Sequence, residues 1–240
     1  MTIVSFTDLD DTLFYSRRKL SDGEPCRVAA LLPDGQPGAF SDGRQQMLFS
    51  LIGQYSIIPV TGRRTDSLQR VQLPFSSFKI ASHGAIVLDA DNQLYQPWQR
   101  MLDNEEPAWR SRICELAQCI SRFAANAGLD LRVRVIEDHG YACYVCIKGP
   151  DDHLKQVIDA QELCTPSNGF YRHINERNLA YMPPYASKRN AVAFLKKEIS
   201  KASKTTTFFG IGDSISDAGF MSECDFQIIP SNSQIAGKLR

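Results

Sequence analysis

Residues 2–12 of the chain read TIVSFTDLDDT, a short apolar run that ends at a cluster of acidic side chains. A continuous apolar run of this length is typical of a strand buried on both faces of a parallel sheet. Asp8 and Asp10 are two residues apart, so their carboxylates lie on the same side where the strand ends. Two adjacent carboxylates repel each other unless a cation lies between them, and magnesium prefers such oxygen ligands. The stretch therefore predicts a strand that leads into a metal site; the alternative is a pair of solvated loop acids that cap a helix.

Polar groups also follow two later strands and begin one helix. An apolar run over residues 56–60 ends at Thr61, another over 205–211 ends near Asp213, and a predicted helix begins at Lys188. The carboxyl ends of parallel strands open onto one edge of a sheet, where ligands bind. A phosphate ester suits a magnesium site at that edge, because the metal neutralises charge that develops on the phosphoryl group. We therefore expect these groups to converge there: Asp8, Asp10, Thr61, Lys188, Asp213 and Asp217.

The composition excludes several other classes of protein. The 27 basic and 27 acidic residues give a net charge of zero, which argues against a nucleic-acid partner. A charged content of only 22% and an aromatic content of 10% exclude a disordered acidic chain. No stretch approaches the roughly 18 apolar residues of a membrane span, so no membrane partner is expected. The chain begins without a signal-peptide pattern, and its seven scattered cysteines are expected to be reduced thiols of a cytoplasmic protein.

The order of the predicted elements divides the chain into two domains. Strands and helices alternate over residues 1–84 and 185–240, which predicts an α/β domain with a parallel sheet built from both ends of the chain. Residues 85–184 follow the order αββαββ instead, which predicts an inserted α+β domain with an antiparallel sheet. Within it we expect a hairpin over residues 85–95 and a long helix over residues 105–127.

With these motifs in place, the chain resembles the haloacid dehalogenase (HAD) superfamily of aspartyl phosphohydrolases. The inserted domain resembles, in its element order, the cap domain of subfamily IIB, which includes sucrose-phosphate phosphatase and Cof-type sugar phosphatases. Two positions depart from the usual pattern, because Ser216 and His83 stand where many members of that subfamily carry Asn. The motifs that carry the resemblance are Asp8-x-Asp10-x-Thr12, Thr61 after an apolar strand, Lys188, and Gly212-Asp213-Ser214-x-Ser216-Asp217.

The resemblance implies a Rossmann-like core and a magnesium-dependent phosphatase that acts on a small phosphorylated metabolite, a sugar or sugar-acid phosphate. It implies that Asp8 is the nucleophile and that Asp10 is the general acid and then the general base. Magnesium would be bound by Asp8, the backbone carbonyl of Asp10 and Asp213, with Asp217 as a further ligand or a group that orients the others. The phosphoryl oxygens would be held by Thr61, Gly62 and Lys188.

Substrate recognition is expected at the entrance and on the last hairpin of the inserted domain. For the hairpin the alternative is an exposed turn, and for His83 it is a hinge. Two other functions stay open: a phosphomutase of the same superfamily, and a regulatory module phosphorylated on aspartate. The sequence leaves the oligomeric state open. The candidate substrate residues are His83, Arg172, His173, Asn175, Glu176 and Arg177.

Overall fold

The computed structural model describes residues 2–20, 23–163, 165–175, 177–203 and 205–239, and it divides the chain into two compact units. The first unit comprises Met1–Tyr95 and Lys188–Arg240, and the second comprises Gln96–Ser187. The predicted boundaries placed residues 85–95 in the inserted domain, whereas in the structure these residues lie in the first unit. The reason is that β7 (Ile86–Leu88) pairs antiparallel with β6 (Lys79–Ala81) of the first unit. The predicted hairpin forms as well, through an antiparallel bridge between Leu88 and Leu94.

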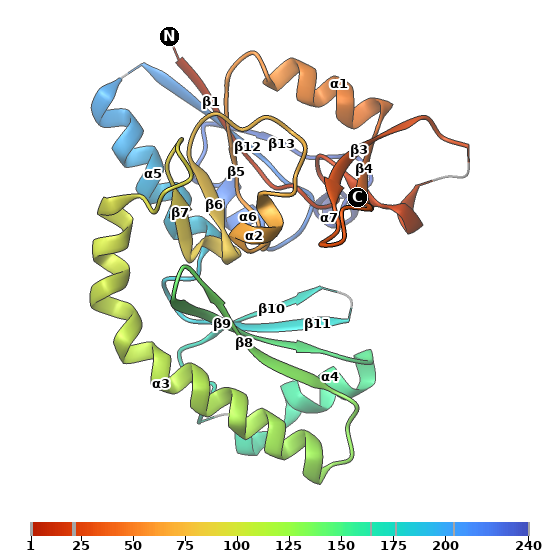
Figure 1. Cartoon of the computed structure of the whole chain (residues 1–240), viewed down its shortest axis with the longest axis vertical. Helices are drawn as coiled ribbons and strands as arrows, with labels where there is room; N and C mark the ends of the chain where they lie inside the picture. The colour runs from red at the N-terminus through yellow and green to blue at the C-terminus, as the bar shows by residue number, and fades with distance from the viewer. Residues whose placement is uncertain (1, 21–22, 164, 176, 204, 240) are drawn as a thin grey trace. The chain divides into compact units, whose positions relative to one another are not determined.

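The main sheet of the first unit is parallel and joins the two ends of the chain. Its four strands lie in the order β13-β12-β1-β5, and Figure 1 shows the red β1 in the same sheet as the blue β12. Phe6, Ile58 and Phe208 in these strands are almost fully buried, as expected of a parallel sheet covered on both faces. The α/β fold predicted from the sequence is thus confirmed. The strands are β1 (Thr2–Thr7), β5 (Ser56–Pro59), β12 (Thr206–Ile211) and β13 (Phe226–Ile228).

The strand register determines where the parallel strands end relative to one another. Thr7 lies opposite Ile211 in β12 and opposite Pro59 in β5, so β1, β5 and β12 end side by side. Beyond β5, β6 joins the edge through a parallel bridge between Val60 and Ile80. The residues that follow these strand ends therefore meet at one edge of the sheet.

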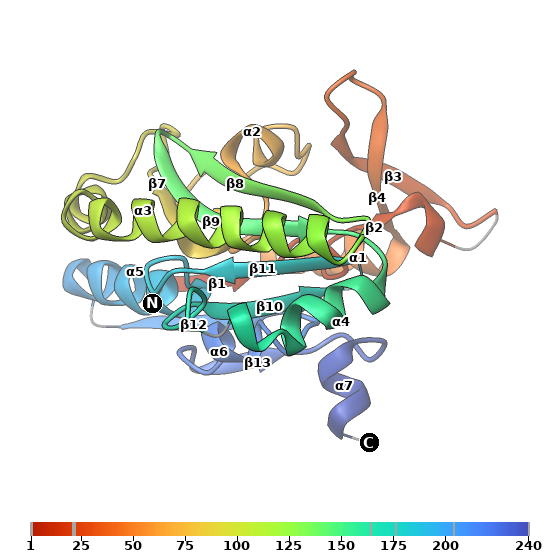
Figure 2. The same ribbon diagram turned by 90° about the horizontal axis from the view of Figure 1, so that it is seen from below.

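Helices and a side sheet complete the first unit. Asp42 caps α1 through a capping box with Gln45. Figure 2 shows β3 and β4 extending from the unit as a hairpin, with β2 paired to β4. The remaining elements of this unit are β2 (Tyr15–Ser16), β3 (Cys26–Leu31), β4 (Pro37–Asp42), α1 (Gly43–Ile52), α2 (Thr65–Leu68), α5 (Lys188–Ala202), α6 (Ala218–Met221) and α7 (Gln234–Leu239).

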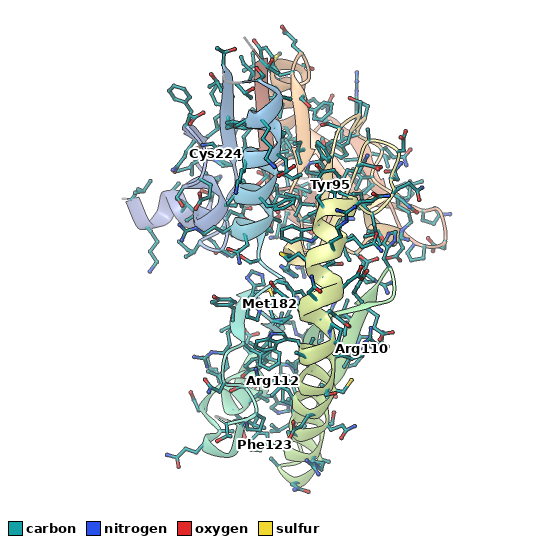
Figure 3. All side chains as sticks on the ribbon, turned by 90° about the vertical axis from the view of Figure 1, so that its left-hand side faces the viewer. Tyr95, Arg110, Arg112, Phe123, Met182 and Cys224 are labelled. Carbon is teal, nitrogen blue, oxygen red and sulfur yellow. The ribbon has the colours of Figure 1, made fainter. Side chains whose placement is uncertain are left out.

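The second unit is a four-stranded antiparallel sheet with two helices, in the predicted order αββαββ. The strand order is β10-β11-β9-β8, and Figure 1 shows α3 and α4 on the same face of this sheet. Figure 3 shows Arg110, Arg112 and Phe123 along the long helix α3. The elements are α3 (Gln96–Asn126), β8 (Arg132–Asp138), β9 (Tyr141–Lys148), α4 (Asp151–Asp159), β10 (Tyr171–Asn175) and β11 (Asn178–Met182).

Helix α3 begins nine residues before the predicted start at residue 105. Its buried stripe extends backward through Trp98 and Leu102, and Pro107 lies inside the helix without ending it. The Glu106 carboxylate accepts a hydrogen bond from the Ala142 backbone N–H at 2.8 Å, which ties this part of α3 to β9. Tertiary packing therefore overrides the local signal of Pro107.

No helix in the described parts of the chain combines the length and apolar character needed to cross a membrane.

Candidate active site

The first acidic loop continues directly from β1 and turns sharply. The Asp8 N–H donates to the Ile211 carbonyl at 2.8 Å, so Asp8 is still held by the neighbouring strand. The Leu13 N–H then donates to the Leu9 carbonyl at 2.9 Å, which closes a turn around Asp10 and Asp11. Leu9 and Leu13 are buried and anchor the turn to the core. The Asp8 carboxylate therefore stands on a fixed part of the backbone, at the edge predicted from the sequence.

Three buried carboxylates and one ammonium group form the centre of the site. One carboxylate oxygen each from Asp8, Asp213 and Asp217 lie within 4.8 Å of one another. The Lys188 Nζ, at the first residue of α5, donates to Asp8 Oδ1 at 2.6 Å and to Asp217 Oδ1 at 2.7 Å. Thr12 Oγ1 donates to Asp213 Oδ1 at 3.1 Å, so the first motif also contacts the last. The structure thus brings together side chains that are about 200 residues apart in the sequence.

Asp217 is held more firmly than the other two carboxylates. Its Oδ2 accepts from both the backbone N–H and the Oγ of Ser214, at 3.1 and 2.7 Å. The Ser216 Oγ contacts the Ser214 Oγ instead, at 2.7 Å. The hydrogen-bonding pattern makes Asp217 a group that orients Lys188 as much as a candidate ligand.

Burial and mutual repulsion decide the electrostatics of this cluster. Burial raises the pKa of Asp8 well above its ordinary value, although Lys188 acts against it. Burial and the neighbouring Asp217 raise the pKa of Asp213 to about 6. Burial also disfavours the ionised form of Asp217, but Lys188 and the bonds from Ser214 outweigh it and lower its pKa.

The cluster fits a hard divalent cation. With all three carboxylates ionised, the single ammonium group of Lys188 leaves an excess of two negative charges in a buried place. A divalent ion neutralises this excess, and carboxylate oxygens are the ligands that magnesium prefers. The residues that would hold it are Asp8, Asp213 and Asp217.

Asp10 lies apart from this cluster and is paired with Arg63. The guanidinium Nε and Nη2 of Arg63 donate to the two oxygens of Asp10, each at 2.7 Å. Arg63 in turn lies over the Phe14 ring, with 4.9 Å to its centroid, and donates to Ser67 Oγ at 3.3 Å. Sequence reasoning assigned no role to Arg63, although it directly follows the Thr61-Gly62 pair. The residue type is itself a signal for such pairing, because arginine is the side chain that most often binds a carboxylate through two parallel hydrogen bonds.

Thr61, Gly62 and His83 form a second loop beside Asp10. Thr61 is buried, and its Oγ1 accepts the Arg63 N–H at 3.1 Å, while the His83 N–H donates to the Thr61 carbonyl at 3.0 Å. A Cβ on Gly62 would lie 2.5 Å from the His83 ring, so only glycine fits there. Ser82, His83 and Gly84 all have positive φ, which bends the chain back toward Thr61. His83 therefore packs against the predicted phosphate-binding loop.

Comparisons with solved structures give the fold a name. No protein-family model matches the chain, and no curated protein matches it. The structure of the sucrose-phosphatase from Synechocystis, in complex with sucrose and phosphate, matches 100% of this chain and 87% of its own, with 15% identity and a TM-score of 0.63. A haloacid dehalogenase-like hydrolase from B. subtilis matches 100% of this chain and 92% of its own, with 14% identity and a TM-score of 0.53. The chain has the haloacid dehalogenase fold.

A trehalose-6-phosphate phosphatase related protein shares this haloacid dehalogenase fold as well, with 15% identity and a TM-score of 0.53. The match covers 97% of this chain and 93% of that one. Because the matches span nearly the whole chain, they include both units. The resemblance inferred from the four motifs is thereby confirmed for the fold.

The substrate candidates on the hairpin of β10 and β11 belong to the second unit and do not form one group. Arg172 lies opposite Tyr181 and His173 opposite Ala180, so the two neighbours on β10 point to opposite faces of the sheet. Arg177 is exposed in the turn between β10 and β11, and of Asn175 only the backbone is described. Glu176 lies outside the described residues. The hairpin is therefore divided between two faces.

Proposed function

We propose that this protein is a magnesium-dependent phosphatase that hydrolyses a small phosphate monoester through a phosphoryl group carried on Asp8. The observation that carries the proposal is the Asp8 carboxylate, fixed at a strand end and hydrogen-bonded to Lys188 inside a cluster of buried acids. The solved structures of similar fold include a phosphatase of sucrose phosphate and a protein related to trehalose-6-phosphate phosphatase. Both names support a sugar phosphate as the substrate class.

The first half of the reaction transfers the phosphoryl group to the enzyme. A carboxylate oxygen of Asp8 attacks phosphorus, and the bond between phosphorus and the alcohol oxygen breaks. Asp10 gives a proton to the departing alkoxide. Thr61, Gly62 and Lys188 hold the phosphoryl oxygens. Bound magnesium would supply charge neutralisation on the transferring group.

The second half returns Asp8 to its starting state. Asp10, now ionised, takes a proton from a water molecule, whose oxygen attacks the phosphorus of the aspartyl phosphate. The bond between Asp8 and phosphorus breaks, and inorganic phosphate leaves. Arg63 keeps the ionised Asp10 carboxylate in one orientation through two hydrogen bonds, as its role as the base in this second half requires.

We further propose that the first unit is the catalytic core and that the second unit is the inserted domain that selects the substrate. The cysteines that the structure describes are free thiols, which supports a reducing compartment such as the cytoplasm.

The test is a panel of phosphate monoesters assayed with magnesium, using Asp8→Asn and a matched control. Asp8→Asn is expected to lose phosphate release by several powers of ten, because an amide oxygen is a poor nucleophile. Asp11→Asn is the control, since Asp11 lies in the same loop but pairs with Lys19 outside the cluster, and Asn tolerates its positive φ. Rapid quenching and mass spectrometry should find the phosphoryl group on Asp8 of the wild type.

Equal phosphate release by Asp8→Asn would remove Asp8 from the mechanism. A phosphomutase would instead isomerise its substrate and require a bisphosphate, so phosphate release without added bisphosphate would contradict that alternative. A phosphorylated Asp8 that persists for hours with every ester would favour a regulatory module.

A further inference from the structure

A cavity of about 170 Å³ lies in the first unit, apart from the cluster of buried acids. All of its lining residues fall within positions 65–92, on α2, on the segment that follows it, on β6, and on β7 with the turn after it. Figure 1 shows α2 in the same part of this unit as β6 and β7. Lys79 is the charged residue among those that line the space, so we call it the Lys79 cavity.

The walls of the Lys79 cavity are mostly apolar. Leu88 lies directly opposite Lys79 in the antiparallel pair of β6 and β7, so their side chains leave the pair on the same face. The apolar lining residues are Leu68, Val71, Leu73, Phe75 and Leu88. Thr65, Gln69 and Asn92 add polar atoms, and the exposed Gln69 and Asn92 stand at the rim. The cavity therefore has a polar mouth and an apolar interior.

Lys79 is buried although its ammonium group has a single hydrogen-bond partner. The residue is 7% exposed, and its Nζ donates to the Ser77 carbonyl at 3.2 Å. An ammonium group carries three donors, and among the described residues Lys79 has no second hydrogen bond and no carboxylate partner. A buried charge is unfavourable unless it is paired. A bound anion would supply the missing partner.

The acids nearest to Lys79 do not take that place. Burial lowers the pKa of Lys79, and Asp89 and Asp91 offset this effect only in part. The Asp89 Oδ1 accepts the backbone N–H groups of Asp91 and Gln93 at 3.0 and 2.9 Å, so it is engaged in the turn after β7. Asp91 is exposed to solvent. The ammonium group therefore keeps unused donor capacity at the buried end of the cavity.

The size and lining of the cavity select the class of occupant. An apolar cavity of about 150 Å³ is enough to bind benzene, so the Lys79 cavity has room for a group of that size. Such a group would pack against apolar walls, while a negative charge on it would reach Lys79. Inorganic phosphate would instead lose its hydration against walls that offer it few donors. A carboxylate on a small apolar body fits both the walls and the ammonium group.

We propose that the Lys79 cavity binds a small organic carboxylate with an aromatic or branched apolar body, through an ion pair between the carboxylate and the Lys79 ammonium group. The site lies outside the residues assigned to the proposed reaction and does not depend on that reaction. Its wall nevertheless adjoins them, because Leu68 belongs to α2, and Ser67 of the same helix accepts a hydrogen bond from Arg63 at 3.3 Å. A ligand in the cavity thus packs against the helix that contacts Arg63.

The experiment measures the binding of benzoate to the whole protein by calorimetry and by backbone amide NMR signals. Lys79→Met keeps the apolar stem and removes the charge, so it should fold with an unchanged or higher Tm and weaken benzoate binding at least about tenfold. Lys197→Met is the control, since Lys197 is exposed on α5 of the same unit and loses the same charge. Benzoate should bind this control as it binds the wild type. The NMR signals that shift should belong to residues 65–92.

The neutral analogue benzyl alcohol decides the role of the charge without any substitution. It fills the same space, so the wild type should bind it at least about tenfold more weakly than benzoate. Equal affinities for the two compounds, or equal benzoate affinities of the wild type and Lys79→Met, would overturn the ion pair. Absence of binding to the wild type at millimolar benzoate would overturn the site. Shifts confined to the residues around Lys188 would place benzoate in the candidate active site and overturn the proposal as well.

Discussion

The substitution Gly62→Ala probes how closely the Thr61 loop packs against His83. The new Cβ would lie 2.5 Å from Cε1 and 2.6 Å from Nε2 of the imidazole ring. Carbon atoms in contact normally stay about 3.5–4.0 Å apart, so the ring or the loop must move by about 1 Å. The positive φ values of Ser82, His83 and Gly84 leave the backbone of His83 little freedom to follow. Overpacking of this kind costs about 1–3 kcal/mol of unfolding free energy.

The same displacement should reduce catalysis. A misplacement of about 1 Å costs up to a hundredfold in rate when a group must hold the reacting atoms. We therefore expect kcat of Gly62→Ala to fall by ten- to a hundredfold, measured as phosphate release on the best ester of the panel. Urea denaturation gives the loss of stability. Gly43→Ala is the control, because no atom outside its chain neighbours lies within 4 Å of the Cβ it would gain.

A double-mutant cycle decides whether the contact with His83 is the cause. His83→Ala removes the ring, so Gly62→Ala should cost far less stability in that background than in the wild type. If the two changes were additive within about 0.5 kcal/mol, the close approach of Gly62 and His83 would not explain the loss, and the reasoning would be refuted.

Three further changes test other parts of the structure. The N–H of Phe208 donates to Asp225 at 2.9 Å and lowers the pKa of that carboxyl. Asp225→Asn should therefore reduce the free energy of unfolding by about 1 kcal/mol above pH 4, and by progressively less as the pH falls below 4. A Tm difference between wild type and variant that grows in acid would contradict this. The buried Tyr185 hydroxyl donates to the Ala142 carbonyl at 2.5 Å, so Tyr185→Phe should lose about 1–2 kcal/mol in urea denaturation with kcat unchanged. Magnesium at a hundred times its Kd should stabilise the wild type by about 2.7 kcal/mol, and Asp213→Asn should lose most of this gain; a full gain in the variant would exclude Asp213 as a ligand.

Local sequence carried enough information for the central sheet and the acidic strand ends. An apolar run such as residues 2–7 is a buried strand in almost any parallel sheet, because both of its faces are covered. A carboxylate directly after such a run lies at the carboxyl edge of the sheet, so the sequence by itself places Asp8 and Asp213 at that edge. The order αββαββ of the second unit followed in the same way from the changing period of its apolar residues.

Contacts between distant segments were beyond the sequence. The pairing of Arg63 with Asp10 and the bridge that Lys188 makes between Asp8 and Asp217 depend on which strands and helices become neighbours. The sequence prediction placed the start of α3 nine residues too late and missed the pairing of β7 with β6, because burial of Trp98 and the proximity of β6 depend on tertiary packing.

The antiparallel sheet of the second unit shows the division most clearly. Alternation of side chains along a strand puts Arg132 and Arg134 on one side of β8 whatever the strand pairs with. Only the tertiary structure set the register that puts Lys148 opposite Arg132 and covers the other face with helices. A period of two residues determines which side chains share a face, whereas their partners across the sheet are chosen by the lowest free energy of the whole packed unit.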